Sequence, residues 1–202
     1  MSVNDVVMVL NYNFFEPDQF QEPQKGKVLV SEPFLLDNYF KRSIVLITEH
    51  NEEGTIGFVL NKPVSVNINE VIENFPKFNA EVALGGPVST NTLHYLHTMG
   101  DIIPNSVHVL GNIFWSGDFD VVERLVSSGS IGPDQIRFFL GYSGWSPNQL
   151  DDELADNAWL VSDISPEEIM MPLNKHFWNK ALQRMGKKYE MWSNFPENPE
   201  MN

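Results

Sequence analysis

The sequence contains no cysteine among its 202 residues. This absence excludes disulfide bonds, thiolate catalysis, zinc–thiolate sites and iron–sulfur clusters held by cysteine. It also fits a protein of a reducing compartment. Hydrophobic residues make up 42% of the chain, which is ordinary for a soluble globular protein. A chain of this length buries enough surface to fold without a disulfide or a metal.

Positive charge is scarce. Thirteen Lys and Arg residues stand against 27 Asp and Glu residues, which gives a formal net charge of −14. Such a molecule as a whole repels nucleic acid and anionic membranes, so direct binding of DNA conflicts with the composition. Five of the bases fall in one short stretch, at Lys175, Lys180, Arg184, Lys187 and Lys188. We interpret this stretch as the solvated face of a helix, or alternatively as a docking surface for an acidic partner.

Long apolar runs are also missing. The run Val6–Leu10 is too short to span a bilayer, and no other segment approaches that length. Asp5 precedes this run where a signal peptide carries positive charge, and the first basic residue is Lys25. We therefore expect a cytoplasmic protein with no membrane association.

The chain is expected to form one domain, because 202 residues are long for one domain and short for two. Residues 1–24 contain Pro, Asn and Gln and are expected to be an N-terminal extension, partly disordered. Residues 25–188 are expected to form the domain. Residues 189–202 are rich in Pro and Asn and are expected to be a C-terminal tail.

Apolar runs and turn signals predict short strands and helices in mixed order. Strands are expected at 27–32, 43–48, 55–60, 81–84, 92–97, 106–110, 136–140 and 158–161. Helices are expected at 68–75, from a cap at Asp118 to 127, after a cap at Ser146-Pro147, and at 173–185. The run 43–48 is dense enough for a central strand that is covered on both faces. Because a hairpin is implied at 51–54 and no steady βαβ rhythm exists, the predicted class is α+β with a mixed, largely antiparallel sheet.

The most informative stretch is residues 137–150, where an apolar strand runs through Gly141, Gly144 and Trp145 into a helix start. A rigid aromatic beside two glycines at such a junction is typical of a loop that lines a pocket. The stretch also resembles a hydrolase nucleophile elbow around Ser143. That motif needs glycine two residues after the serine, and Trp145 stands there. We therefore interpret Ser143 as a turn residue.

Other chemical motifs are weak. The turn Gly85-Gly86-Pro87 is followed by no Gly-Lys-Ser/Thr, so it is no Walker loop. His94 and His97 fall in an expected strand, where side chains three positions apart point to opposite faces and cannot bind one ion together. The acids at 151–153 complement the dipole of a helix start. We expect no metal and no cofactor.

Several motifs recur together, in order, in one known family. They are Arg42-Ser43, Glu49-His50, Gly57–Asn61 with Pro63, Gly85–Val88, Leu96-His97, Trp115–Asp118, Gln149-Leu150, Glu153-Leu154 and Trp159-Leu160. Over residues 26–185 this pattern resembles the YqgE/AlgH family of bacterial proteins. The resemblance implies an α+β fold with a branched sheet that curls into a barrel-like shape and is flanked by helices. It implies no established biochemical activity; members are often treated as transcriptional regulators. The chain departs from the family pattern at Asn148, where glycine is usual.

The leading functional hypothesis is a non-enzymatic binding or regulatory protein without catalytic residues. Its ligand would be an unidentified protein or small molecule. The candidate binding surface combines residues from several loops that the resemblance brings together: Arg42, Asn61, Gly85, Gly86, Asp118, Gly144, Trp145 and Gln149. Arg42 would pair with an acidic group, the glycines would allow close approach, and Trp145 and Gln149 would supply a stacking face and an amide. Alternatively, these loops have only a structural role.

A second hypothesis is a hydrolase or transferase of unrecognised type. It would use Glu49, His50 or Asp118 as an acid or base.

Overall fold

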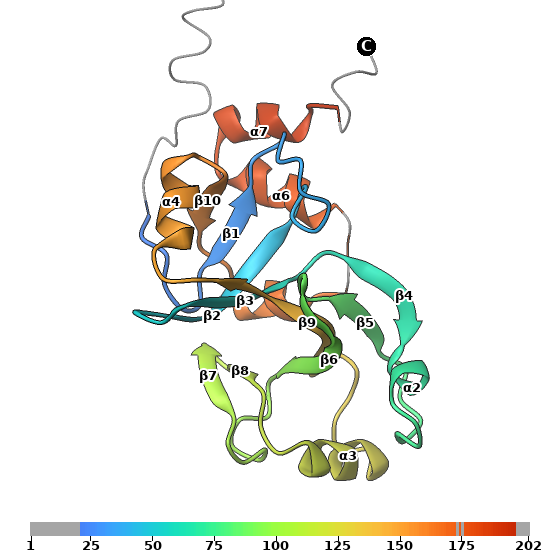
Figure 1. Ribbon diagram of the computed structural model, residues 1–202. Helices are drawn as coiled ribbons and strands as arrows, with labels where there is room; N and C mark the ends of the chain where they lie inside the picture. Colours follow the sequence, from blue (N-terminus) through green and yellow to red (C-terminus); the bar gives the residue numbers. More distant parts are fainter. Residues whose placement is uncertain (1–20, 173, 175, 197–202) are drawn as a thin grey trace, which may run out of the picture.

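The computed structural model describes residues 21–172, 174 and 176–196 (Figure 1). Within these residues ten strands form one sheet. The strands are β1 (Val28–Ser31), β2 (Ile44–Asn51), β3 (Gly54–Val59), β4 (Pro63–Asn67), β5 (Glu81–Leu84), β6 (Val88–His97), β7 (Val107–Leu110), β8 (Ile113–Trp115), β9 (Ile136–Trp145) and β10 (Trp159–Ser162). The helices are α2 (Ile68–Val71), α3 (Phe119–Ser127), α4 (Gln149–Ala155), α5 (Pro166–Met170), α6 (Phe177–Arg184) and α7 (Lys187–Ser193).

The α+β class is confirmed, and each predicted strand region contains a strand. Strands β4 and β8 were not predicted. Helix α2 ends at Val71, earlier than the apolar spacing up to Phe75 suggests, and α6 begins only at Phe177. The predicted cap of α3 is confirmed, because the Asp118 side chain accepts a hydrogen bond from the backbone N–H of Val121.

The sheet branches at β9. Its strand order is β10-β1-β2-β3-β9-β6-β8-β7, and β5 pairs with β9 in addition, with β4 on its far side. Strand β9 bonds β3 through residues 143–145, β5 through 138–140 and β6 along most of its length. The β5–β9 pair is parallel and the other pairs are antiparallel. The two ends of β9 therefore belong to different parts of the sheet.

The expected barrel-like shape is wrong. In the described part of the chain β10 pairs only with β1 and β7 only with β8, so the two edges of the sheet do not meet. A barrel needs a closed ladder with one face turned inward. Here β1, β2 and β3 bury apolar residues on both faces. Such strands are covered by other elements on both sides of the sheet and do not enclose a barrel interior.

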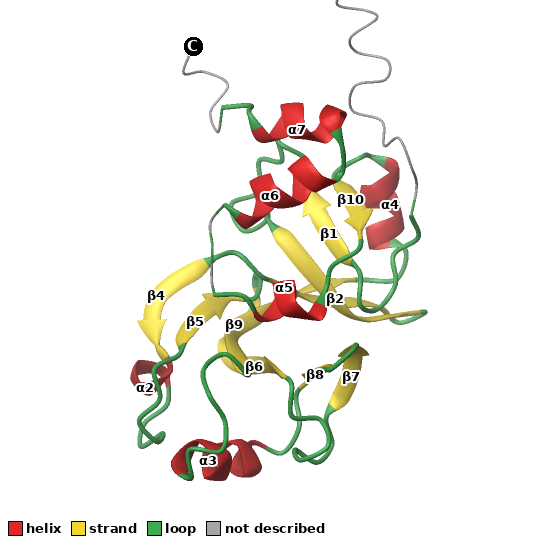
Figure 2. Ribbon diagram, turned by 180° about the vertical axis from the view of Figure 1, so that it is seen from behind, coloured by secondary structure: helices red, strands yellow, loops and turns green. Residues whose placement is uncertain are grey.

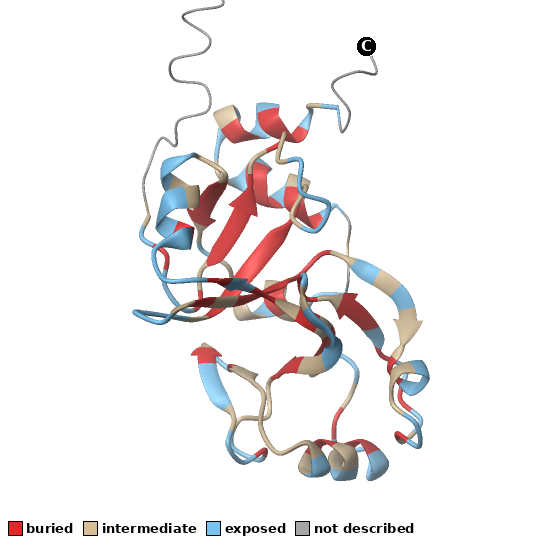
Figure 3. Ribbon diagram, in the orientation of Figure 1, coloured by how far each residue is buried: buried red, intermediate tan, exposed pale blue. Residues whose placement is uncertain are grey.

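Alternate residues of these three strands enter two different cores. Val30 and Phe58 belong to a core that also holds Trp178 of α6 and Trp192 of α7. Leu29, Val45 and Val59 belong to a second core, which Trp145, Leu150 of α4 and Trp159 complete. Figure 3 shows β1 and most of β2 as buried, while the ends of β2 and β3 at their hairpin are partly exposed. Strand β2 is thereby confirmed as a central strand covered on both faces.

A third core lies at the opposite end of the molecule. There α2 and α3 cover β5, β6 and the first half of β9, with Val82, Val122 and Phe138 among the buried residues. Figure 2 shows α5 on the rear of the sheet, between this end and the α6–α7 end. Ile169 of α5 and Phe177 of α6 share the first core with Phe139, in the first half of β9.

Helix α7 runs across the boundary expected at 188, and its residues Tyr189 and Trp192 are buried. Most of the expected extension 1–24, the end of the tail at 197–202, and residues 173 and 175 lie outside the described residues. None of the helices in the described part of the chain has the length and apolarity needed to cross a membrane.

Candidate functional site

Arg42 and Asn61 are neighbours, as the binding hypothesis requires. Asn61 is buried; its side-chain oxygen accepts from the backbone N–H of Ile44 at 3.0 Å, and its amide donates to the Arg42 carbonyl at 2.9 Å. The Arg42 guanidinium lies 5.0 Å from the ring centre of Trp178 and donates to the carbonyl of Phe195. Asn61 therefore braces the backbone, and Arg42 links that turn to α6 and the end of α7.

Gly85 and Gly86 lie directly against β9. A Cβ atom on Gly85 would lie 2.2 Å from the carbonyl oxygen of Gly141, and one on Gly86 would lie 2.4 Å from that of Tyr142. The Ser143 hydroxyl donates to the Gly85 carbonyl at 3.0 Å and is fully buried. Both glycines permit close strand packing, and Ser143 is held within that packing.

Trp145 does not present a stacking face. Strand β9 continues through this residue, where a loop was expected, and the residue is only 4% exposed. Its indole N–H donates to Glu153 at 2.8 Å, and the indole of Trp159 donates to the same carboxylate oxygen at 2.7 Å. Gln149 donates to the other oxygen of Glu153 at 2.9 Å. This indole clamp, Trp145–Glu153–Trp159, fixes α4 against the sheet.

The start of α4 also differs from expectation. Its N-cap is Asn148 with φ 64°, and no side chain caps it, so Ser146-Pro147 is not the cap. Asn tolerates this left-handed backbone better than most residues, which agrees with the glycine usual at this position.

Asp118 lies far from these residues, at the N-terminus of α3 at the bottom of Figure 1. Arg42 and Asn61 border one hollow of about 570 Å³, and Gly144 and Trp145 border another of about 420 Å³. The two linings share no residue, and Asp118 belongs to neither. The eight predicted residues thus lie in separate places and do not form one surface; whether any of them binds a ligand stays a prediction.

The residues of the enzyme hypothesis are also dispersed. Glu49 and His50 are adjacent at the end of β2, so their side chains leave opposite faces of the strand. Glu49 accepts from Asn51, while His50 shares a hydrogen bond of 2.7 Å with Thr55. Asp118 is the cap of α3 at the other end of the molecule. The structure therefore brings no two of these three groups together over a common space.

The histidines of β6 have structural partners. His97 is fully buried and bonds the Ser116 carbonyl at 2.8 Å, and burial lowers its pKa. His94 packs against the rings of Phe58 and Tyr142, and burial lowers its pKa as well. Among the residues that the structure describes, no three His, Asp or Glu side chains gather as metal ligands would.

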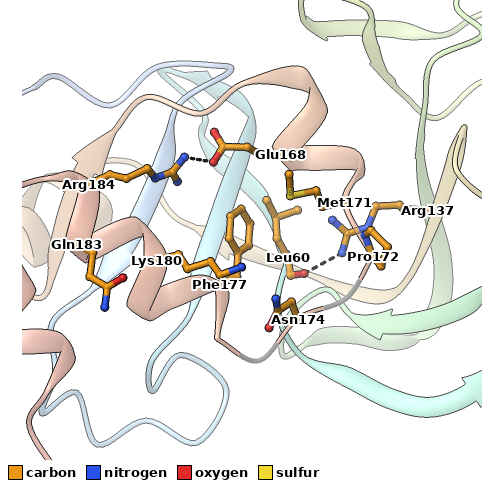
Figure 4. A pocket seen from close by; sticks show the side chains of 10 residues that line it. All are labelled: Leu60, Arg137, Glu168, Met171, Pro172, Asn174, Phe177, Lys180, Gln183 and Arg184. Carbon is orange, nitrogen blue, oxygen red and sulfur yellow. Dashed lines mark hydrogen bonds and ion pairs between the residues drawn. The ribbon is translucent and has the colours of Figure 1, made fainter.

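A larger cavity, of about 600 Å³, lies between the end of β3, β9, α5 and α6 (Figure 4). We call it the Arg137 cavity; its lining consists of Leu60, Arg137, Glu168, Met171, Pro172, Asn174, Phe177, Lys180, Gln183 and Arg184. A volume of this size is typical of small-molecule sites.

Local sequence explains how the cavity is built. Ser165 and Glu168 form a capping box that starts α5 at Pro166 and turns the Glu168 side chain back toward the helix start. On α6 the buried residues Phe177, Trp178, Ala181 and Leu182 share one face, which leaves Lys180, Gln183 and Arg184 exposed beside the cavity. Period-2 alternation in β9 puts Arg137 and Phe139 on the face that looks toward these two helices.

Arg137 is a charged residue inside an apolar strand and is only 8% exposed. Its two terminal nitrogens donate to the carbonyls of Ile169 and, at 2.8 Å, of Leu60. The guanidinium lies 5.4 Å from the ring centre of Phe139. Burial lowers the pKa of Arg137 to about 10, so it is charged at neutral pH.

No carboxylate of the described residues lies within ion-pair distance of Arg137. Glu168, the acid in the lining, pairs with Arg184. The sequence patterns predict Arg137 only as part of an apolar strand. The sequence feature that could have indicated a functional role is a lone base followed by three apolar residues in a buried strand. A buried charge is costly unless something compensates it, so such a base needs an explanation.

The AlgH-like family model matches residues 28–190 of the chain. A UPF0301 protein of Chlorobaculum parvum is 40% identical over 185 residues, which cover 92% of this chain and 99% of that protein. A UPF0301 protein of Bacteroides thetaiotaomicron is 43% identical over 181 residues, covering 89% of this chain and 92% of the relative.

Two solved structures are similar in fold. The solution structure of the AlgH protein from Pseudomonas aeruginosa matches with a TM-score of 0.69 and 28% identity, over 88% of this chain and 98% of that one. A crystal structure of a Corynebacterium diphtheriae protein matches with a TM-score of 0.72 over 88% of this chain and 95% of that one. At 23% identity this second likeness concerns the fold alone.

Proposed function

This chain belongs to the AlgH-like family of bacterial proteins, and from that premise we propose that it is a non-enzymatic binding protein whose small ligand occupies the Arg137 cavity. The resemblance to this family that the sequence motifs indicate is confirmed. The names of the relatives state no activity, so the function has to be argued from the site itself.

The observation that carries the proposal is the buried guanidinium of Arg137. A buried charge is costly unless it is paired and hydrogen-bonded, and two backbone carbonyls compensate this one only in part. The charge borders a cavity of about 600 Å³, into which a ligand could bring the missing negative group.

The enzyme hypothesis finds less support. Glu49 and His50 each have a hydrogen-bond partner beside them, and Asp118 caps a helix at the other end of the fold. General acid–base chemistry needs such groups within hydrogen-bond reach of one reacting molecule. Arg137 is charged at neutral pH, which suits a binding group better than a general base.

We place the protein in the cytoplasm, on the absence of cysteine and of an apolar segment long enough for a membrane in the described residues. Direct binding to nucleic acid is not part of the proposal, because the net charge is −14. The protein would have a regulatory role if binding of the ligand altered the exposed surface of α6 and thereby the affinity for a protein partner.

The test compares two methionines of similar exposure. Met171 lines the cavity and is 52% exposed, while Met191 on α7 is 49% exposed and lies outside the lining. Met171→Trp fills the mouth of the cavity, and Met191→Trp adds the same ring elsewhere. Binding of a fragment library with anionic, neutral and cationic members is measured by ligand-observed NMR.

We expect wild type and Met191→Trp to bind the same fragments, and Met171→Trp to lose them. The proposal is refuted if wild type binds none of the fragments, or if Met171→Trp binds them as well as Met191→Trp does. Far-UV circular dichroism checks that both variants are folded.

A further inference from the structure

We infer that the ligand of the Arg137 cavity is an amphipathic monocarboxylate, with its carboxylate on the Arg137 guanidinium and its apolar body against Leu60, Met171 and Phe177. The inference rests on the proposed function and adds the chemical class of the ligand.

The donors come from Arg137. A guanidinium carries five N–H groups in a planar fork. Two of them donate to the carbonyls of Leu60 and Ile169, which leaves three without an acceptor among the described residues. A carboxylate accepts two parallel N–H bonds from such a fork, and these charge-assisted bonds are strong. The two carbonyl bonds fix the fork in place before the ligand arrives.

The walls beside the fork are apolar. Leu60, Met171, Pro172 and Phe177 line the cavity, and Figure 4 shows the first three close to the Arg137 head group. Phe177 lies between that head group and the Glu168–Arg184 pair in the same view. An apolar chain that leaves the fork would contact these side chains and remove them from water.

The charges favour a single negative charge. Two cations of the lining, Arg137 and Lys180, have no acidic partner among the described residues, whereas Arg184 pairs with Glu168. Lys180 is exposed, so water screens its charge, and Arg137 is the buried cation that a ligand would neutralise. A phosphate carries up to two charges and more acceptor oxygens than one fork satisfies, so its desolvation would cost more. A monocarboxylate matches one guanidinium.

The experiment uses octanoate and its neutral analogue octanamide as probes. Calorimetric titration of the full chain is expected to give an affinity for octanoate at least ~10-fold above that for octanamide, because a charge-assisted pair is lost in the amide. Octyl phosphate is expected to bind more weakly than octanoate.

Arg137→Lys and two matched pairs of variants locate the probe. Arg137→Lys keeps the charge without the fork and is expected to weaken octanoate binding roughly tenfold. Met171→Trp, in which Arg137 is intact, is expected to abolish binding, whereas Met191→Trp preserves it; this pair serves if Arg137→Lys does not fold. Lys180→Gln is expected to weaken binding a few-fold, and Lys187→Gln on α7 has no effect.

The inference is overturned if octanamide binds as tightly as octanoate, if octyl phosphate binds more tightly, or if Met171→Trp retains the affinity. The experiment distinguishes a wrong ligand class from a wrong binding site. If octanoate does not bind while other fragments are lost in Met171→Trp, the ligand class is wrong and the proposed function stands. If Met171→Trp loses no fragment at all, both are wrong.

Discussion

Glu153 is expected to stabilise the fold far more than an ordinary helix acid does. It accepts the indole N–H groups of Trp145 and Trp159, which are 4% and 1% exposed, at 2.8 Å and 2.7 Å. In Glu153→Ala both N–H groups lose their acceptor inside the core that α4 covers. An unsatisfied buried donor costs about 1–3 kcal/mol, so the variant should lose about 2–6 kcal/mol of unfolding free energy.

Glu153→Gln offers a finer comparison. The amide oxygen can still accept from both indoles, but it carries no charge. Hydrogen bonds to charged groups contribute about 1.5–3 kcal/mol each against about 0.5–1.5 for neutral ones, so a loss of about 2–3 kcal/mol is expected for the two indole bonds. Asp152→Ala is the control, because this neighbour is exposed and contributes only about 0.3–1 kcal/mol through the helix dipole.

Urea unfolding followed by far-UV circular dichroism measures all three variants. With a typical slope of about 1–3 kcal/mol per molar urea, the midpoint of Glu153→Ala should fall by about 1 M or more. If Glu153→Ala lost no more stability than Asp152→Ala, the indole clamp would have no energetic role. Our explanation of the burial of Trp145 would then be wrong.

Three other predictions concern residues of the candidate surface or their neighbours. Gly85→Ala should destabilise the protein by at least about 2 kcal/mol in urea unfolding, because its Cβ would lie 2.2 Å from a β9 carbonyl. The control Gly144→Ala, whose Cβ would lie 3.2 Å from the movable ring of Tyr142, should lose less than about 1 kcal/mol. Equal losses in the two variants would contradict this explanation. Burial and, secondly, the charge of Asp118 raise the pKa of Tyr95 to about 12 from 10.0. The folded state thus holds this proton more tightly than the unfolded chain, and stability is lost as the pH rises from about 10 to about 12; Tyr95→Phe should remove part of that loss in urea titrations, and an unchanged pH profile would refute the assignment. Asp118→Ala should cost about 1 kcal/mol as a lost helix cap and Asp118→Asn much less, and Asp118→Ala should leave fragment binding at the Arg137 cavity unaltered.

The elements could be predicted from the sequence where local signals agree. The dense run that became β2 and the cap at Asp118 are examples, because period, composition and flanking residues favour one structure at each. Local signals misled where distant contacts decide. Gly141 and Gly144 suggested a loop, yet pairing with β3 and β6 continues β9 as far as Trp145.

The site was harder to predict than the fold. Of the predicted surface, Arg42 and Asn61 are neighbours and Trp145 and Gln149 both bond Glu153, whereas Asp118 lies at the other end of the molecule. The Arg137 cavity is formed by α5, α6 and two strands that are far apart in sequence, and no local pattern shows that they meet. Only the unusual position of a base in a buried strand pointed to it.

The branching of the sheet at β9 has a consequence for how the molecule comes apart. Residues 138–140 are bonded to β5 on one edge and β6 on the other, while 143–145 hold β3. Both ends of the protein pair with this one strand, so we expect them to unfold together and not as separately folding fragments. The slowest-exchanging amide protons should cluster along β9, and a protease should find no hinge between the α3 end and the α6–α7 end.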